Sequence, residues 1–182
     1  MAEVVLRRVG PGDAELIHAW RGEAATRAYQ PIVEVPIEGV RRMLRDRAVS
    51  RVEPMATGKL QWMVLAGEEP AGWISLDVVS RGHAAAAVGY TIAPHLHGQG
   101  IGTAALTALL PTAFEPTRLN LARLEGVAAV DNVGSRRVME RAGFRQEGVL
   151  RGLLEIEGVR VDHALYGLLR TDWVAWRRAG EG

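Results

Sequence analysis

Residues 88–103 read Val-Gly-Tyr-Thr-Ile-Ala-Pro-His-Leu-His-Gly-Gln-Gly-Ile-Gly-Thr, an apolar strand followed by a glycine loop and the start of a helix. The helix is indicated by apolar residues that share one face at i, i+3, i+4, i+7 and i+8, namely Ile101, Ala104, Ala105, Ala108 and Leu109. Glycines at alternate positions let the backbone approach a ligand closely, and the first N–H groups of a helix lack partners. The stretch therefore predicts a binding site for a phosphate or pyrophosphate.

Two well-known phosphate loops do not fit this stretch. The dinucleotide fingerprint has a third glycine where this chain has Thr103, and no acidic residue for a ribose follows on a neighbouring strand. The nucleoside-triphosphate loop needs a lysine followed by Ser or Thr, but Lys59 is the only lysine in the chain. A glycine-rich turn before a structural helix is the alternative interpretation.

A second stretch, residues 127–148, predicts a strand, a helix that stops at Gly143, and another strand. In this order the two stretches resemble the GNAT acetyltransferases. There a strand leads into [Arg/Gln]-x-x-Gly-x-[Gly/Ala], and a later strand leads into Asn-x-x-Ser or Asn-x-x-Ala, a short helix and Gly-Phe. The corresponding residues here are His97, Gly100, Gly102, Asn132, Ser135, Gly143 and Phe144.

The resemblance extends over residues 4–173. The later part of the chain is similar to the branch that contains ribosomal-protein alanine and polyamine N-acetyltransferases. The residues that carry this likeness are Gly148-Val149-Leu150-Arg151, Gly158, Asp162, Tyr166 and Trp173.

Composition sets limits on the classes of partner. The chain has 182 residues, a formal net charge of +1 and no cysteine. This charge balance gives no case for nucleic-acid or membrane-surface binding, and a chain without cysteine has no disulfide, thiolate metal site or cysteine nucleophile. The start, Met1-Ala2-Glu3, is unlike a signal peptide, and no apolar run approaches the ~18 residues of a membrane span. We expect one domain, residues 1–182, in the cytoplasm.

The N-terminal region predicts a strand over 4–8 and two helices. Asp13 is expected to cap the first helix, which buries Leu16, Ile17 and Trp20, and Pro36 is expected to open the second, which buries Val40, Met43 and Leu44. The other faces of the second helix carry Arg41, Arg42, Arg45 and Arg47. These arginines form a solvated face or, alternatively, a basic rim over an acceptor site.

The rest of the chain alternates strands and helices, which is an α/β or α+β pattern with a mixed sheet. Residues 60–66 and 71–79 predict a hairpin that packs Trp62 and Trp73, and 84–92 predict the fourth strand. Pro111 is expected to kink or end the following helix, and the fifth strand is expected to end at Val130. A last hairpin, 145–155 and 159–169, turns at Glu157-Gly158, and Trp173 and Trp176 are expected to close the sheet edge.

The resemblance implies a GNAT fold, with a mostly antiparallel sheet that splays between strands 4 and 5, and acetyl-CoA as co-substrate without a metal. Its cofactor-binding positions fall on Thr91, Ile92, Ala93, His97, Gly98, Gln99, Gly100, Ile101, Gly102, Thr103, Asn132 and Ser135. His97 stands where the family usually has Arg or Gln, but histidine can still donate to a phosphate. A metal site at His95 and His97 would lack a carboxylate or a third ligand nearby in sequence.

The implied chemistry is direct attack of an amine on the acetyl thioester, with a backbone N–H near Ile92 or Ala93 stabilising the oxyanion. Met139 occupies the usual tyrosine position and cannot donate a proton, so Ser135 is the candidate acid. Alternatively, Ser135 is a first-turn serine that satisfies a backbone N–H. The position of the family's hairpin glutamate falls on Leu154. The candidate bases are therefore Glu155 and Glu125, whereas Asp162 is expected to organise the hairpin instead.

We therefore expect an N-acetyltransferase for a primary amine, with a protein N-terminal amine as one acceptor. A polyamine or aminoglycoside acetyltransferase and a non-catalytic acyl-CoA-binding module are the alternatives. The apolar region around Trp173 and Trp176 would suit a homodimer.

Overall fold

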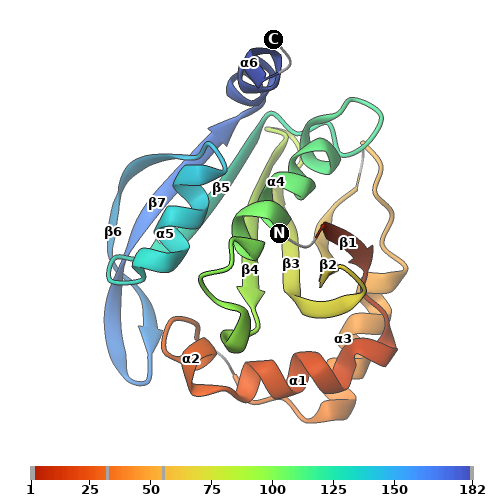
Figure 1. The fold of residues 1–182 in the computed structure, drawn as a ribbon, viewed down its shortest axis with the longest axis vertical. Helices are drawn as coiled ribbons and strands as arrows, with labels where there is room; N and C mark the ends of the chain where they lie inside the picture. The colour runs from red at the N-terminus through yellow and green to blue at the C-terminus, as the bar shows by residue number, and fades with distance from the viewer. Residues whose placement is uncertain (1–2, 32, 55, 181–182) are drawn as a thin grey trace.

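The computed structural model describes residues 3–31, 33–54 and 56–180, so the start at Met1 and Ala2 lies outside the described residues. Its centre is a seven-stranded sheet in the order β1-β2-β3-β4-β5-β7-β6 (Figure 1). The strands are β1 (Val4–Arg8), β2 (Gly58–Ala66), β3 (Glu69–Ser80), β4 (Ala85–Ile92), β5 (Arg123–Ala129), β6 (Arg145–Ile156) and β7 (Val159–Leu169). Neighbours are antiparallel except β4 and β5, which are parallel. The predicted mixed, mostly antiparallel sheet is confirmed.

The β4–β5 pairing is short. It joins residues 85–87 to residues 123–125, and beyond these the two strands separate. Each strand stays paired on its other side, because β4 follows β3 as far as Ile92 and β5 follows β7 as far as Ala129. The sheet is therefore open between β4 and β5, as the resemblance implied, and we call this opening the gap.

Helices cover both faces of the sheet (Figure 1). They are α1 (Ala14–Gly22), α2 (Ala24–Arg27), α3 (Ile37–Ala48), α4 (Ile101–Phe114), α5 (Val133–Arg141) and α6 (Arg170–Gly180), with short 3-10 turns at Pro11–Asp13 and Pro94–Leu96. Among the described residues, no helix has the length and apolar character needed to cross a bilayer.

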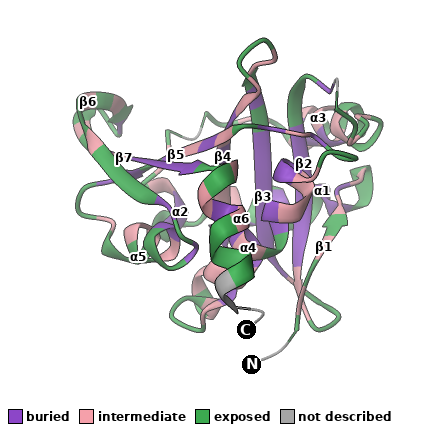
Figure 2. Ribbon diagram, turned by 90° about the horizontal axis from the view of Figure 1, so that it is seen from above, coloured by how far each residue is buried: buried purple, intermediate pink, exposed green. Residues whose placement is uncertain are grey.

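Side-chain alternation along the strands divides the interior into two cores. On one face α4 and α5 pack on Trp62, Ile74 and Val88, and on the other α1 and α3 pack on Met63 and Trp73. Trp73 stacks on Trp20 of α1, with ring centroids 6.2 Å apart. Figure 2 shows β2 and β3 as largely buried and the edge strand β6 as largely exposed. The predicted packing of both hairpin tryptophans is confirmed, but they lie on opposite faces.

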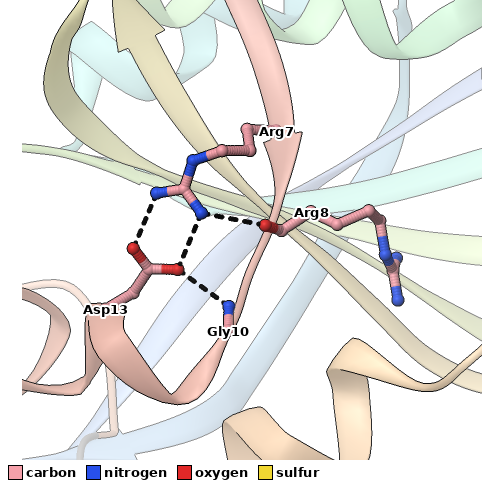
Figure 3. A network of polar contacts seen from close by, with 4 residues as sticks. All are labelled: Arg7, Arg8, Gly10 and Asp13. Carbon is pink, nitrogen blue, oxygen red and sulfur yellow. Dashed lines mark hydrogen bonds and ion pairs between the residues drawn. The ribbon is translucent and has the colours of Figure 1, made fainter.

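The entry into α1 differs from the prediction. The Asp13 side chain makes no capping bond to α1; instead its Oδ2 accepts from the Gly10 N–H at 2.8 Å, and its carboxylate pairs with Arg7 at 2.7 Å (Figure 3). Leu16 is exposed, whereas Ile17 and Trp20 are buried as expected. The Asp13 carboxylate binds Arg7 of β1 and does not cap α1, because a charge-assisted pair is stronger than a hydrogen bond between neutral groups.

The helix after the glycine loop also differs. It continues through Pro111 to Phe114, and a hydrogen bond from the Glu115 N–H to the Pro111 carbonyl closes its last turn. Ala108 is exposed and Ala104 is half-buried, so the buried face is rotated from the expected one. The larger residues determine this face, because they lose more on exposure than alanine does. They are Ile101, Leu106, Leu109, Leu110 and Phe114.

The C-terminal tryptophans do not close a sheet edge. The edges are β1 and β6, while α6 follows the inner strand β7. Trp173 is buried against Phe114 of α4, with ring centroids 5.4 Å apart, and Trp176 is exposed. Trp173 and Trp176 differ in exposure because only the start of α6, where Trp173 lies, packs over the core.

Gly72 of β3 generates a stability prediction. A Cβ at this position would lie 2.2 Å from the Thr91 carbonyl oxygen and 2.9 Å from the Ile92 Cα, and the Gly72 φ is +155°. We expect Gly72→Ala to lower the free energy of unfolding by about 2–4 kcal/mol, because backbone atoms must shift and the backbone conformation is strained. Urea unfolding followed by circular dichroism measures this change.

The matched control is Gly89→Ala, whose Cβ would meet only the Ser75 Oγ, at an ordinary 3.7 Å. A loss at Gly72 no larger than that at Gly89 would contradict the close approach of β3 and β4.

Candidate functional site

A cavity of about 780 Å³ passes through the gap. Its lining includes residues on the α4–α5 face, such as Val88 and Val138, and residues on the α1–α3 face, such as Gln61 and Trp73. Since the β4 and β5 backbones are unpaired here, the cavity connects the two faces of the sheet. Among the described residues that line it, none is an aspartate or a glutamate.

The glycine loop lies at one end of the cavity. Gly98 and Gly100 have φ angles of +78° and +80°, a region that favours glycine, and Gly100 is the N-cap of α4 without a side-chain cap. The residues of this loop and first turn that line the cavity are Gly98, Gly100, Ile101, Gly102 and Thr103, whereas Gln99 does not. The first N–H groups of α4 are therefore open to an anion.

His97 lines the cavity, but one of its ring nitrogens binds the backbone. Its Nε2 lies 2.8 Å from the Ile92 carbonyl oxygen, which can only accept, so this nitrogen is the donor. Positive charge near the loop comes from α5, where Arg137 and Arg141 line the cavity. Their i, i+4 spacing puts them on one helix face. Sequence reasoning missed them, although that spacing was a usable signal.

The β4 backbone supplies polar groups to the gap. Thr91 and Ile92 line the cavity, but Ala93 does not, because its N–H donates to the Ala71 carbonyl at 2.9 Å. Antiparallel neighbours alternate in direction, so the polar groups of Ile92 and Tyr90 point away from β3 and into the gap. The Ala93 N–H is therefore not available to an oxyanion. Of the two candidates expected from the sequence, Ile92 and Ala93, only Ile92 has an N–H that faces the gap.

Asn132 and Ser135 begin α5 at the edge of the cavity. The Asn132 Oδ1 accepts from the Ser135 N–H at 3.0 Å and caps the helix, which leaves its amide NH₂ for the cavity. Ser135 does not satisfy a backbone N–H. Its Oγ lies 2.9 Å from the Tyr90 hydroxyl, which also donates to the Ser135 carbonyl at 3.0 Å. The helix serine and the β4 tyrosine are thus coupled across the gap.

Met139, at the usual tyrosine position, is a core residue. It is 1% exposed, and its side chain occupies the space left by Gly126 of β5, where a Cβ would lie 2.5 Å from the Met139 Cε.

The three carboxylates considered from the sequence lie away from the cavity lining. Glu125 contacts Arg123 at 3.6 Å, and Glu155 contacts Arg160 at 3.5 Å. Asp162 accepts from the Gly152 N–H at 2.7 Å and so organises the β6–β7 hairpin. Side-chain alternation turns Glu155 away from the face on which Leu154 lines the cavity.

His163 of β7 is a cavity residue that sequence reasoning missed. It is 2% exposed, and its Nδ1 lies 2.9 Å from the Val161 carbonyl oxygen. Because a carbonyl only accepts, Nδ1 carries the proton, and Nε2 of the neutral ring keeps its lone pair. No local motif surrounds His163; its role depends on β7 pairing with Ala129 at the open end of β5.

The far end of the cavity, on the α1–α3 face, is basic. Arg21, Arg47 and Lys59 line it, and we call these three residues the basic end. Of the arginines expected on the second helix, only Arg47 reaches the cavity. Arg41 instead forms surface ion pairs with Glu15 and Glu38.

A sheet that splays beside a glycine loop is the arrangement of the GNAT acetyltransferases. The chain belongs to this family, because the family model described as "Acetyltransferase (GNAT) domain" matches residues 3–145. A curated relative, "Putative ribosomal N-acetyltransferase YdaF" of Bacillus subtilis (strain 168), is 42% identical over 102 residues. That alignment covers 56% of this chain and 55% of the relative, so the chain spans about half the length of the relative it matches.

Solved structures share the fold over nearly the whole chain. RimJ of Mycobacterium smegmatis, in complex with CoA-disulfide, has a TM-score of 0.77 and 26% identity, and covers 96% of this chain and 90% of its own. Spermidine N-acetyltransferase of Vibrio cholerae, in complex with CoA and spermine, has a TM-score of 0.80 and 20% identity, with 94% and 98% covered.

Tyr90 generates a titration prediction. Burial raises the pKa of Tyr90 to about 12, although the hydrogen bond with Ser135 acts in the opposite direction. Burial also raises the pKa of Tyr166, so we expect a near-ultraviolet titration of the folded protein to show a late tyrosinate transition that is smaller in Tyr90→Phe. Because the folded protein holds this proton more tightly than the unfolded chain, the Tyr90 contribution to stability should disappear as pH rises from about 10 to about 12.

The same titration in denaturant is the control, since unfolding should return every tyrosine to the ordinary range near 10. A difference between wild type and Tyr90→Phe that is centred near pH 10 in the folded protein would contradict the buried hydroxyl.

Proposed function

We propose that the protein is an acetyl-CoA-dependent N-acetyltransferase that transfers the acetyl group directly to a primary amine. The observation that carries this proposal is the gap, which joins a glycine loop on one side of the sheet to a second ligand space on the other. Two substrates that enter from opposite faces can meet there without a covalent enzyme intermediate.

The residues on the α4–α5 face fit coenzyme A. The open N–H groups at the start of α4 suit a pyrophosphate, and Arg137 and Arg141 add positive charge beside them. The β4 backbone groups that face the gap, of which the Ile92 carbonyl is held by His97, suit the amides of a pantetheine arm, which would lie beside them like another strand. The free NH₂ of Asn132 is a further donor on this path.

Acetyl-CoA supplies an activated acetyl thioester, and the residues of this chain would act on the atoms around it. The Ile92 N–H would stabilise the oxyanion that forms when the amine nitrogen bonds to the carbonyl carbon. As the carbon–sulfur bond breaks, the Ser135 hydroxyl would give a proton to the sulfur and would regain one from solvent after the products leave, while the Tyr90 hydroxyl would hold Ser135 in position. The His163 Nε2 would accept the proton that the amine loses, in place of Glu125 and Glu155.

The acceptor we propose includes a protein N-terminal amine. This choice is supported by the name of the relative YdaF and by the pKa of an α-amine, about 8, which leaves a useful neutral fraction near pH 7.

The cofactor site is tested by calorimetry of acetyl-CoA with Gly100→Glu. We expect micromolar affinity for the wild-type protein and no detectable binding for the variant, because the carboxylate would stand among the N–H groups that receive the pyrophosphate. Gly100→Gln is the matched control: it strains the same φ of +80° without adding charge, so it should bind measurably better than Gly100→Glu. Equal loss in the two variants would count against a phosphate at this loop.

The proton-transfer roles are tested by steady-state kinetics of Ser135→Ala and His163→Gln. Loss of the acid should slow acetyl transfer about 10²-fold with all acceptors, with little change in acetyl-CoA affinity. Loss of the base should slow transfer most for the more basic amines, and raising the pH towards the pKa of the amine should relieve the defect.

Met139→Leu, a conservative change in the core beside the gap, serves as the control for packing effects. A wild-type rate for Ser135→Ala would show that Ser135 is not the acid. A defect in His163→Gln that is the same for every amine would show that His163 is not the base.

A further inference from the structure

The proposed function leaves the basic end without a role. Arg21 in α1, Arg47 near the end of α3 and Lys59 in β2 line the cavity on the α1–α3 face. The cations assigned to the coenzyme A phosphates, Arg137 and Arg141, belong to α5 on the other face. A second anion would therefore have to come from the acceptor.

The three cations of the basic end lie close enough to repel one another. Burial, followed by the charge of Arg21, lowers the pKa of Arg47, and burial, followed by the charges of Arg47 and Arg21, lowers the pKa of Lys59. Lys59 is nevertheless an exposed residue, at the mouth of the cavity.

Asp77 is the acidic group that faces the basic end. It stands opposite Lys59 across the β2–β3 pair, and its charge raises the pKa of both Lys59 and Arg47. None of the ion pairs among the described residues includes a basic-end residue. One exposed carboxylate thus faces three cations, and the basic end keeps an excess of positive charge.

The basic end is held in place by the surrounding structure. Arg47 donates to the Oε1 of Gln61, a residue of β2 that is 2% exposed. The Arg8 guanidinium donates to the backbone carbonyls of Arg47 and Ser50, and so ties the end of α3 to β1. These contacts fix the guanidinium of Arg47 before any ligand arrives, which lowers the entropy cost of binding.

Thr26 of α2 adds an independent observation. It lines the cavity and is 4% exposed, yet its Oγ1 has no hydrogen-bond partner among the described residues. A buried hydroxyl without a partner is costly, and native proteins rarely leave one. A ligand atom that accepts a hydrogen bond would satisfy it, and the oxygens of a carboxylate or phosphate are such atoms.

We infer that the acceptor amine carries an anionic group, a carboxylate or a phosphate, that Arg21, Arg47, Lys59 and Thr26 bind. This inference rests on the proposed N-acetyltransferase function. The anion positions the acceptor on the α1–α3 face while its amine enters the gap. A polyamine, which is positively charged at every amine, is repelled by the basic end.

The test compares acceptor amines whose second group is anionic, neutral or cationic. They are γ-aminobutyrate, its neutral amide and putrescine; phosphoethanolamine and ethanolamine; and peptides that begin Ala-Asp or Ala-Asn. Acetyl transfer is measured by detecting the coenzyme A thiol that the reaction releases. We expect the anionic member of a series to exceed its neutral partner in kcat/KM by about tenfold, with putrescine the poorest of its series. The series with the largest ratio identifies whether the anion belongs to a small amine or to an acidic N-terminus.

Variants connect the preference to the basic end. Lys59→Glu, Arg47→Gln and Thr26→Val should each lose most of the preference for the anionic acceptor while retaining acetyl-CoA affinity. Arg45→Gln is the matched control, because Arg45 is exposed on α3 and does not line the cavity. Lys59 is exposed, so Lys59→Glu tests the charge even where Arg47→Gln disturbs folding.

Binding measurements separate failure of this inference from failure of the proposed function. Thermal shift of the coenzyme A-saturated protein is recorded with phosphoethanolamine, γ-aminobutyrate and putrescine. Stabilisation by the anionic amines without thiol release would support the anion site and reject acetyl transfer. The inference would be overturned if neutral amines or putrescine were acetylated as fast as the anionic amines, or faster. The proposed acetyl transfer would still be supported. Absence of both transfer and stabilisation by an anionic amine would also overturn the inference.

Discussion

The structure depends on the short pairing between β4 and β5, which stops well before either strand ends. A backbone N–H or carbonyl in the interior needs a partner, so two parallel strands that separate leave polar groups that a side chain, water or a ligand must satisfy, as the His97 ring does for the Ile92 carbonyl. Each strand can leave the other because its second neighbour holds it: β3 pairs with β4 as far as Ile92, and β7 pairs with β5 as far as Ala129. The gap is therefore a fixed feature of the sheet, and the ligand sites lie where the ladder is missing.

Side chains maintain the gap from both faces. On one face Met139 of α5 fills the space beside Gly126, and Ser135 reaches the Tyr90 hydroxyl of β4. On the other face Gln30, beyond α2, donates to the Thr91 hydroxyl at 2.8 Å. The two cores lie on opposite faces of the sheet, so the helices on each face position different groups around the gap.

The parts of the fold and site that local sequence specifies could be predicted. Three features depend on neighbours within a few residues: the glycine loop, the N-cap at Asn132 and the helix stop at Gly143. At the helix stop, the Phe144 N–H donates to the Met139 carbonyl, which is the hydrogen bond of a Schellman motif. The Ser135–Tyr90 contact and the place of His163 depend on strand register and could not be read locally. For α4, alanine gave a poor guide to the buried face, because it gains little from burial.

The net charge of +1 hides a strong local separation of charge. Many carboxylates form ion pairs outside the cavity: Asp13 with Arg7, Glu147 with Arg123, and Glu15 and Glu38 with Arg41. The cavity lining is left with cations on both sides of the sheet and no carboxylate among its described residues. A whole-chain charge balance gives no case for a broad polyanion-binding surface, and it carries no information about a cavity. If the proposed function holds, positive charge at both ends would attract an anionic ligand to each face, and the gap between them would be where two such ligands react.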